Sequence, residues 1–240
     1  MRISYALLTL AAIVWPAKAG DSIAFTPTAE DVVRRLVEMD TLRASTLRSY
    51  ISARRYIAEN AKFAKHAEVG VEESFMPPDQ KVLKVVSETG SPFIRRKVID
   101  KLIEAEIDAI SQDSRDQTHI TPENYNFRLI GTEEMDGASC FVLEVMPKFP
   151  KKYLMRGRVW IDQNDFAIVR MEGSPAKNPS FWTRKVRFVR HYQKHGPFWL
   201  PASVESESEI VIAGKSTLKI EYWDYRIEPR RGLPVAPAGR

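Results

Sequence analysis

The chain has 240 residues, of which 44% are hydrophobic and 28% charged, and its formal net charge is +5. This composition excludes a disordered chain, and the length is sufficient for one domain with a buried core. Lysine and arginine are spread along the chain rather than clustered, which favours a solvated basic surface over nucleic-acid binding and leaves attraction to anionic lipid headgroups open. The single cysteine, Cys140, has no partner for an internal disulfide, so we expect a buried structural thiol.

The N-terminal residues have the pattern of a secretory signal peptide. Met1-Arg2 supplies a positive start, Ile3 to Trp15 an apolar stretch, and Ala17-Lys18-Ala19 a small-residue cleavage site. We therefore expect residues 1–19 to be removed by cleavage near Ala19, leaving an exported, soluble protein in the periplasm. A membrane-anchoring helix is the alternative, although the apolar stretch is short for a membrane span.

Two helices are expected. The first begins at Thr28, a suitable N-cap with Asp31 at the capping-box position, and fades near Thr41 to Ser45. The second runs from about Phe93 to Ser111. Its apolar residues recur at helical spacing and form a wide stripe that needs a covering surface: Ile94, Val98, Ile99, Leu102, Ile103, Ile107 and Ile110.

Short alternating segments separated by turn residues predict about ten strands. They are Tyr50–Ala58, Ala67–Phe75, Lys81–Ser87, Tyr125–Thr132, Ser139–Met146, Arg156–Asp162, Ala167–Glu172, Arg184–Tyr192, Leu200–Ile212 and Ser216–Ile227. Alternation in the first of these places Ile51, Ala53 and Ile57 on one side. Tyr50, Ser52, Arg54 and Tyr56 lie on the other. We expect one domain over residues 20–230 and a disordered tail over 231–240.

Runs of strands without a βαβ rhythm indicate an α+β fold. We predict a strongly curved antiparallel sheet, a half-open β-barrel, with two helices, and we expect the long helix to cover its concave apolar face. That face is either filled by side chains or open to a lipid chain, and the sequence leaves both possibilities open. The candidate residues for an apolar cavity are Ile99, Leu102, Ile103, Phe127, Phe141, Leu143, Val159, Ile161, Val169, Met171, Phe188, Ile220 and Tyr222.

No motif in the chain predicts catalysis. His191 and His195 are four residues apart, but they leave a strand for a turn, so we interpret them as surface residues rather than as metal ligands. Glu205, Glu207 and Glu209 alternate with serines, as a solvated strand face does. We expect no catalytic residue, no metal and no cofactor.

Three stretches carry a family resemblance. They are Gly157-Arg158-Val159-Trp160-Ile161-Asp162, Phe198-Trp199-Leu200-Pro201, and Leu218 to Tyr225. Together with the order of signal peptide, short helix, hairpins, amphipathic helix and meander, they make the chain similar to the LolA-like superfamily of periplasmic outer-membrane lipoprotein-sorting proteins. The resemblance covers about Thr28 to Ile227 and involves no catalytic motif.

The resemblance implies a half-open barrel that binds acyl chains in its apolar interior, a carrier rather than an enzyme. The expected ligands are lipids or the acyl chains of lipoproteins, with envelope proteins of the inner or outer membrane as further partners and no nucleic acid. The sorting proteins have an arginine beside a proline after an early strand, where this chain has Met76 before Pro77. Another lipid-like ligand is therefore equally compatible. The alternative function is a non-enzymatic interaction or sensor module of the cell envelope.

Overall fold

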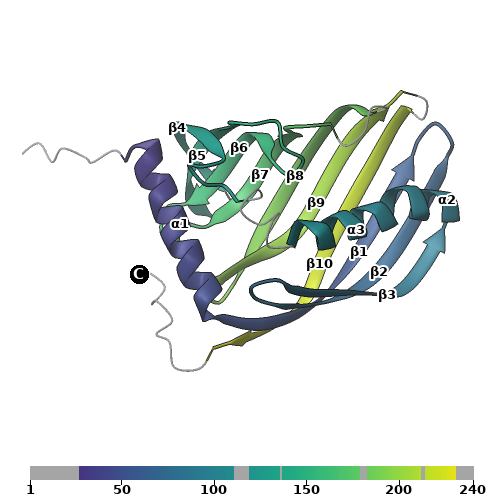
Figure 1. Cartoon of the computed structure of the whole chain (residues 1–240), viewed down its shortest axis with the longest axis horizontal. Helices are drawn as coiled ribbons and strands as arrows, with labels where there is room; N and C mark the ends of the chain where they lie inside the picture. The colour runs from purple at the N-terminus through teal and green to yellow at the C-terminus, as the bar shows by residue number, and fades with distance from the viewer. Residues whose placement is uncertain (1–26, 111–118, 136, 179–182, 212–213, 231–240) are drawn as a thin grey trace, which may run out of the picture.

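The protein forms one open antiparallel sheet of ten strands with two helical segments (Figure 1). The computed structural model describes residues 27–110, 119–135, 137–178, 183–211 and 214–230. The expected signal peptide and C-terminal tail lie outside these residues. Within them, no helix is both long enough and apolar enough to cross a membrane.

The bounds of the elements agree closely with the expected ones. The helical segments are α1 (Ala29–Thr46), α2 (Pro92–Ile94), the π-helical η1 (Arg95–Ile99) and α3 (Asp100–Ile110). The strands are β1 (Leu47–Asn60), β2 (Lys65–Met76), β3 (Gln80–Gly90), β4 (Tyr125–Met135), β5 (Ala138–Pro147), β6 (Met155–Asp162), β7 (Ile168–Pro175), β8 (Thr183–His195), β9 (Phe198–Ile210) and β10 (Gly214–Pro229).

The order of the strands is β3-β2-β1-β10-β9-β8-β7-β6-β5-β4. Every pair except β1–β10 joins strands that follow each other in the chain, so most of the sheet is a meander built from hairpins. The β1–β10 ladder joins the first and last strands, from Leu47 opposite Pro229 to Asn60 opposite Ser216. β3 and β4 remain as free edges, so the sheet is curved but not closed.

Helix α1 begins with the expected capping box. The Thr28 hydroxyl accepts from the Asp31 amide at 3.2 Å, and the Asp31 carboxylate accepts from the Thr28 amide at 3.2 Å. These two bonds satisfy amides that the first helical turn would leave unpaired. The helix continues past the expected end near Thr41 to Ser45, because Leu47 leads directly into β1.

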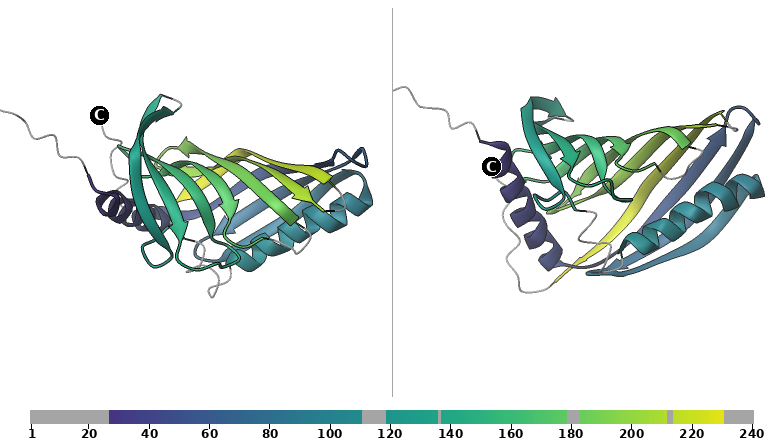
Figure 2. Two further views of the ribbon diagram at one scale, coloured as in Figure 1. Left: turned by 90° about the horizontal axis from the view of Figure 1, so that it is seen from above. Right: turned by 45° about the horizontal axis from the view of Figure 1, so that its top comes forward.

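The second helical segment is nearly continuous from Pro92 to Ile110, as the apolar stripe predicts. Ser91 caps it by accepting from the Ile94 amide at 3.4 Å, and Pro92 occupies the first turn, where its missing N–H costs nothing. Figures 1 and 2 show that α1 and α3 lie at opposite ends of the sheet, with α3 running past β1, β2 and β10.

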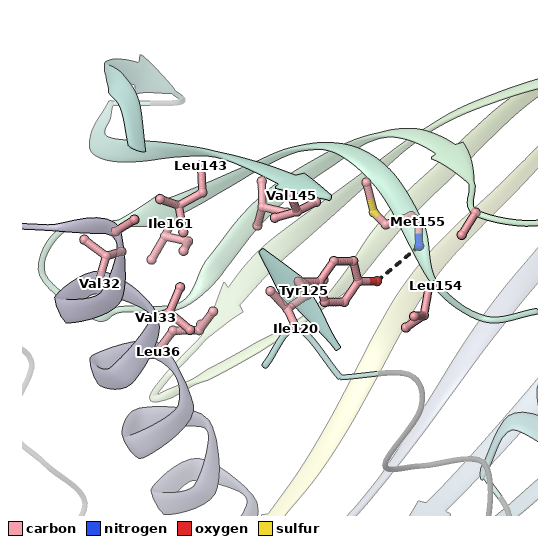
Figure 3. Packing of buried hydrophobic residues seen from close by; sticks show 13 residues of the cluster. Val32, Val33, Leu36, Ile120, Tyr125, Leu143, Val145, Leu154, Met155 and Ile161 are labelled. Carbon is pink, nitrogen blue, oxygen red and sulfur yellow. Dashed lines mark hydrogen bonds between the residues drawn. The ribbon is translucent and has the colours of Figure 1, made fainter. Parts of the chain in front are cut away.

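The concave apolar face is therefore divided between two helices. One cluster, called the α1 cluster here, joins Val32, Val33 and Leu36 to inner residues of β4–β6 (Figure 3). Its Tyr125 hydroxyl accepts from the Met155 amide at 3.1 Å. The other, the α3 cluster, joins Ile94 and Ile99 to residues of β1, β2, β9 and β10. The helical segment from Pro92 to Ile110 therefore covers the part of the concave face formed by β1, β2, β9 and β10, whereas α1 covers the part formed by β4–β6.

Candidate functional site

Most of the predicted cavity residues lie on the inner face of the sheet, the face that carries the helices. Those in or packed against the α1 cluster are Phe127, Phe141, Leu143, Val159, Ile161, Met171 and Phe188. Those in or packed against the α3 cluster are Ile99, Ile103, Ile220 and Tyr222. Leu102 is half-buried on α3. The structure thus gathers the predicted residues into two groups rather than around one cavity.

Val169 lies elsewhere. It packs with Cys140, Val142 and Trp160 in a separate cluster on the opposite, outer face. The cause is a register shift between β6 and β7, where Trp160 is opposite Arg170 and Ile161 is opposite Ile168. Val169 is the extra residue of this bulge, so simple alternation assigns it to the wrong side. Cys140 is buried, as expected.

A strip of half-buried residues crosses the inner face between the two clusters. Phe188 on β8 is opposite Gly173 on β7 and Ser206 on β9, and Ser206 is opposite Leu218 on β10. Met171 occupies the adjacent row, opposite Arg190. We call Met171, Gly173, Phe188, Ser206 and Leu218 the inner strip. All five are half-buried, whereas Val159 and Ile220 on the same face are buried.

Beside the strip lies a buried cluster of charges that the sequence analysis did not identify. Arg54 of β1 is fully buried, and its Nη1 donates to both carboxylate oxygens of Glu106 on α3 at 2.9 Å. Its Nη2 lies 3.4 Å from Glu73 of β2, which is also buried. Lys81 of β3 reaches both acids, with its Nζ 2.7 Å from Glu73 Oε1 and 2.5 Å from Glu106 Oε1.

Tyrosines complete this charge cluster. The Tyr50 hydroxyl donates to Glu73 at 3.0 Å and the Tyr56 hydroxyl donates to Glu106 at 3.1 Å. The Arg54 guanidinium also lies over the rings of Tyr56 and Tyr222, 5.4 and 5.5 Å from their centroids. Burial acts to raise the pKa of Glu106, but Lys81 and Arg54 outweigh it and lower that pKa to about 2. Glu106 is thus ionised at neutral pH.

Arg190 of β8 is a cation of this region that forms no ion pair among the described residues, although the charge of Glu106 contributes to the rise of its pKa. It stands between Met171 and Val204 on the inner face, and no carboxylate of the described chain forms an ion pair with it. The pKa of its guanidinium is raised, chiefly by Tyr192, and the Tyr192 hydroxyl in turn contacts the Met171 sulfur at 3.4 Å. The Nε of Arg190 is buried without a hydrogen bond.

The outer face carries a groove of about 980 Å³. Its lining comes from β1 and β6–β10, and most of its side chains alternate with those of the inner face. Charges of both signs surround it: Arg156, Arg158, Arg187 and Lys219, and Glu59, Glu172, Glu205 and Glu207. The solvated face expected for Glu205, Glu207 and Glu209 is confirmed, because all three are exposed.

His195 differs from its expected surface position. Its ring is half-buried and lies 4.9 Å from the Tyr225 ring centroid, and this burial lowers its pKa. Among the residues that the structure describes, no group of three or more His, Cys, Asp or Glu side chains is arranged to hold a metal. The inner face thus presents an apolar strip with the half-buried Arg190 at its side.

Fold and site together define an open-sheet protein with two helix-covered apolar clusters on its inner face. A protein-family profile described as "Uncharacterized protein" matches residues 112–231. Because this match spans half of the chain, the chain belongs to that family. No curated protein matches the chain.

Three solved structures are similar to the chain. A DUF1329 family protein from Desulfovibrio piger has 15% identity and a TM-score of 0.42, covering 88% of this chain and 97% of its own. A putative outer membrane lipoprotein-sorting protein domain from Vibrio parahaemolyticus has 14% identity and a TM-score of 0.43, covering 86% and 95%. A LolA superfamily protein from Nitrosomonas europaea has 12% identity and a TM-score of 0.39, covering 90% and 99%.

These neighbours include the superfamily that the sequence resembles. All three TM-scores lie below 0.5, so we infer no ligand or activity of this chain from them.

Proposed function

We propose that the protein is a non-enzymatic binding protein for amphiphilic, lipid-like molecules, whose acyl chain lies along the inner strip. The observation that carries this proposal is the half-burial of Phe188 and Met171 at the edge of the α1 cluster and of Leu218 at the edge of the α3 cluster, on the same face. Each methylene moved from water onto such a surface contributes about 0.8 kcal/mol when it is fully buried. An acyl chain of about eight methylenes therefore supplies up to ~6 kcal/mol before the costs of ordering.

The expected signal peptide supports a place for this function outside the cytoplasm. Export into the periplasm, with cleavage near Ala19, puts the protein between two membranes, where lipids and the acyl chains of lipoproteins are the available amphiphiles. Outer-membrane lipoprotein sorting is one process that would use such a carrier. The inner strip suits the acyl chain of a lipoprotein rather than its polypeptide part.

A binding assay with a fluorescent long-chain fatty acid tests this proposal. Phe188→Ser removes the largest side chain of the inner strip, and we expect it to weaken binding by roughly tenfold. Val189→Ser is the matched control, because Val189 is the next residue of β8, is also half-buried and faces the outer groove. Wild-type protein that binds no probe and that carries no lipid in a native mass spectrum contradicts the proposal.

A second candidate function is protein docking at the outer groove. Its volume of about 980 Å³ and its rim of both charge signs favour a polypeptide segment with mixed charges over an acyl chain. Capture of a partner from envelope extracts, lost in Arg187→Glu and retained in Met171→Ser, supports this function, because Met171 belongs to the inner strip and does not line the groove. Capture that is retained in the groove variant and lost in the inner-strip variant assigns the partner to the inner strip instead.

A further inference from the structure

We propose that Arg190 binds the anionic end group, a carboxylate or a phosphate, of an amphiphile whose chain lies on the inner strip. This inference rests on the proposed function and adds to it the class of ligand. It concerns one side chain. Its position, its neighbours and the absence of an ion pair all favour an anionic ligand.

Position is the first argument. Arg190 is two residues from Phe188 on β8, so both side chains lie on the inner face, about 7 Å apart along the strand. Across the sheet, Arg190 is opposite Met171 on β7 and Val204 on β9. The guanidinium thus stands at the side of the inner strip, so that an end group held by Arg190 would place methylenes several carbons further along the chain against Phe188.

Charge is the second argument. The buried region contains three cations, Arg54, Lys81 and Arg190, and two anions, Glu73 and Glu106. Both anions form ion pairs with Arg54 and Lys81, so these five groups carry a net charge of +1, and Arg190 takes part in none of the ion pairs. Arg190 is half-buried, and a partly desolvated guanidinium that forms no ion pair is costly, a cost that an incoming anion reduces. The ligand is therefore expected to bring the missing negative charge.

Geometry is the third argument. A guanidinium presents a planar fork of N–H donors that pairs with the two oxygens of a carboxylate or a phosphate. Tyr192 and Tyr222 lie beside Arg190, and burial raises the pKa of Tyr222 to about 12, so its hydroxyl remains protonated at neutral pH. A protonated hydroxyl can donate a further hydrogen bond to the same anion, and a neutral alcohol headgroup gains less from this set of donors.

The test compares a long-chain fatty acid, the fatty alcohol of equal length and the matching alkyl phosphate. We expect wild-type protein to bind the fatty acid or the alkyl phosphate at least roughly tenfold more tightly than the alcohol. Arg190→Met should remove that preference while leaving the affinity for the alcohol within about twofold. Arg187→Met is the control, because Arg187 is exposed on the same strand and faces the outer groove.

The outcomes separate the two proposals. Binding of all three amphiphiles with equal affinity, unaffected by Arg190→Met, overturns the role of Arg190 and leaves the proposed function intact. Absence of binding to all three overturns the proposed function and the inference with it. Inorganic phosphate that binds as tightly as the alkyl phosphate overturns the amphiphile as ligand. The stronger of the two anionic ligands identifies the end group.

Arg190→Lys guards against a purely structural explanation. It keeps the charge and loses the planar fork, so an intermediate preference for the anion is expected. Thermal unfolding of Arg190→Met should show no loss of stability, because the substitution removes a half-buried charge that forms no ion pair. A strongly destabilised Arg190→Met together with an unchanged anion preference in Arg190→Lys contradicts the proposed contact.

Discussion

At the scale of single residues, the fold depends on charges that are buried but paired. Glu106 reaches down from α3 into the sheet and is held by Arg54 and Lys81. Desolvation raises the pKa of Glu106, but the two cations lower it by more, so that the pKa falls to about 2. This arrangement ties the helix to strands β1 and β3 through one carboxylate.

Stability should therefore decrease in acid. Glu106 binds fewer protons in the folded state, where its pKa is about 2, than in the unfolded chain, where it is near 4.5. Its contribution, about 3 kcal/mol, is present above pH ~4.5 and is lost as the pH falls through ~2. We expect Glu106→Gln to be less stable than wild type at neutral pH and the difference to shrink over this window, as measured by urea unfolding.

Glu38→Gln is the control for this pH prediction. Glu38 pairs with Arg34 at 3.1 Å on the exposed side of α1, and exposed pairs contribute little to stability. Its difference from wild type should be much smaller than that of Glu106→Gln and should change little with pH. A Glu106→Gln variant whose deficit does not change between neutral and acidic pH contradicts the pairing described here.

The sequence could not predict this charge cluster. Alternation in β1 separates Tyr50, Ser52, Arg54 and Tyr56 from Ile51, Ala53 and Ile57, but a period of two does not say which side faces inward. The side with Arg54 is the buried one, because acids distant in the chain, Glu73 and Glu106, neutralise it. Such a partnership depends on tertiary contacts, which no local pattern contains.

At the scale of elements, the sequence was most informative. The capping box, the segment from Phe93 and the ten strands all follow from local chemistry and periodicity, and the structure confirms them. Which helix covers which strands was not predictable, because an amphipathic stripe shows that a helix needs a partner without naming it. The side of the sheet on which Val169 lies was likewise not predictable, because it depends on the register between β6 and β7. A β-bulge shifts that register.

Helix α1 should contribute strongly to stability, although the long helix was expected to cover the whole concave face. Leu36 is 1% exposed within the α1 cluster, and Leu36→Ala should lower the free energy of unfolding by about 2–5 kcal/mol. Leu42→Ala is the matched control on the same helix, because Leu42 is 41% exposed and should lose less than about 1 kcal/mol. Equal losses in the two variants would mean that α1 does not cover β4–β6.

At the scale of the whole molecule, the two helix-covered halves meet in a single sheet at a weak junction. The β7–β8 ladder has four pairs, from Arg170–His191 to Gly173–Phe188, whereas β8–β9 has twelve. Both the inner strip and the outer groove cross this junction, and Gly173, Phe188, Ser206 and Leu218 belong to both. A short ladder between well-packed clusters is the place where local opening costs least.

Hydrogen exchange should expose this weak junction directly. Amides that bond across β7–β8 are expected to exchange faster than those across β1–β10, because fewer neighbouring bonds must break for the junction to open. The β1–β10 ladder serves as the internal reference, because its pairs extend along nearly the whole of β1. Equal protection in the two ladders would show that the sheet opens only as a unit. Faster exchange at β7–β8 would instead place the most easily opened part of the sheet beside Phe188 and Arg190. A ligand that binds on the inner face at this position should slow the exchange.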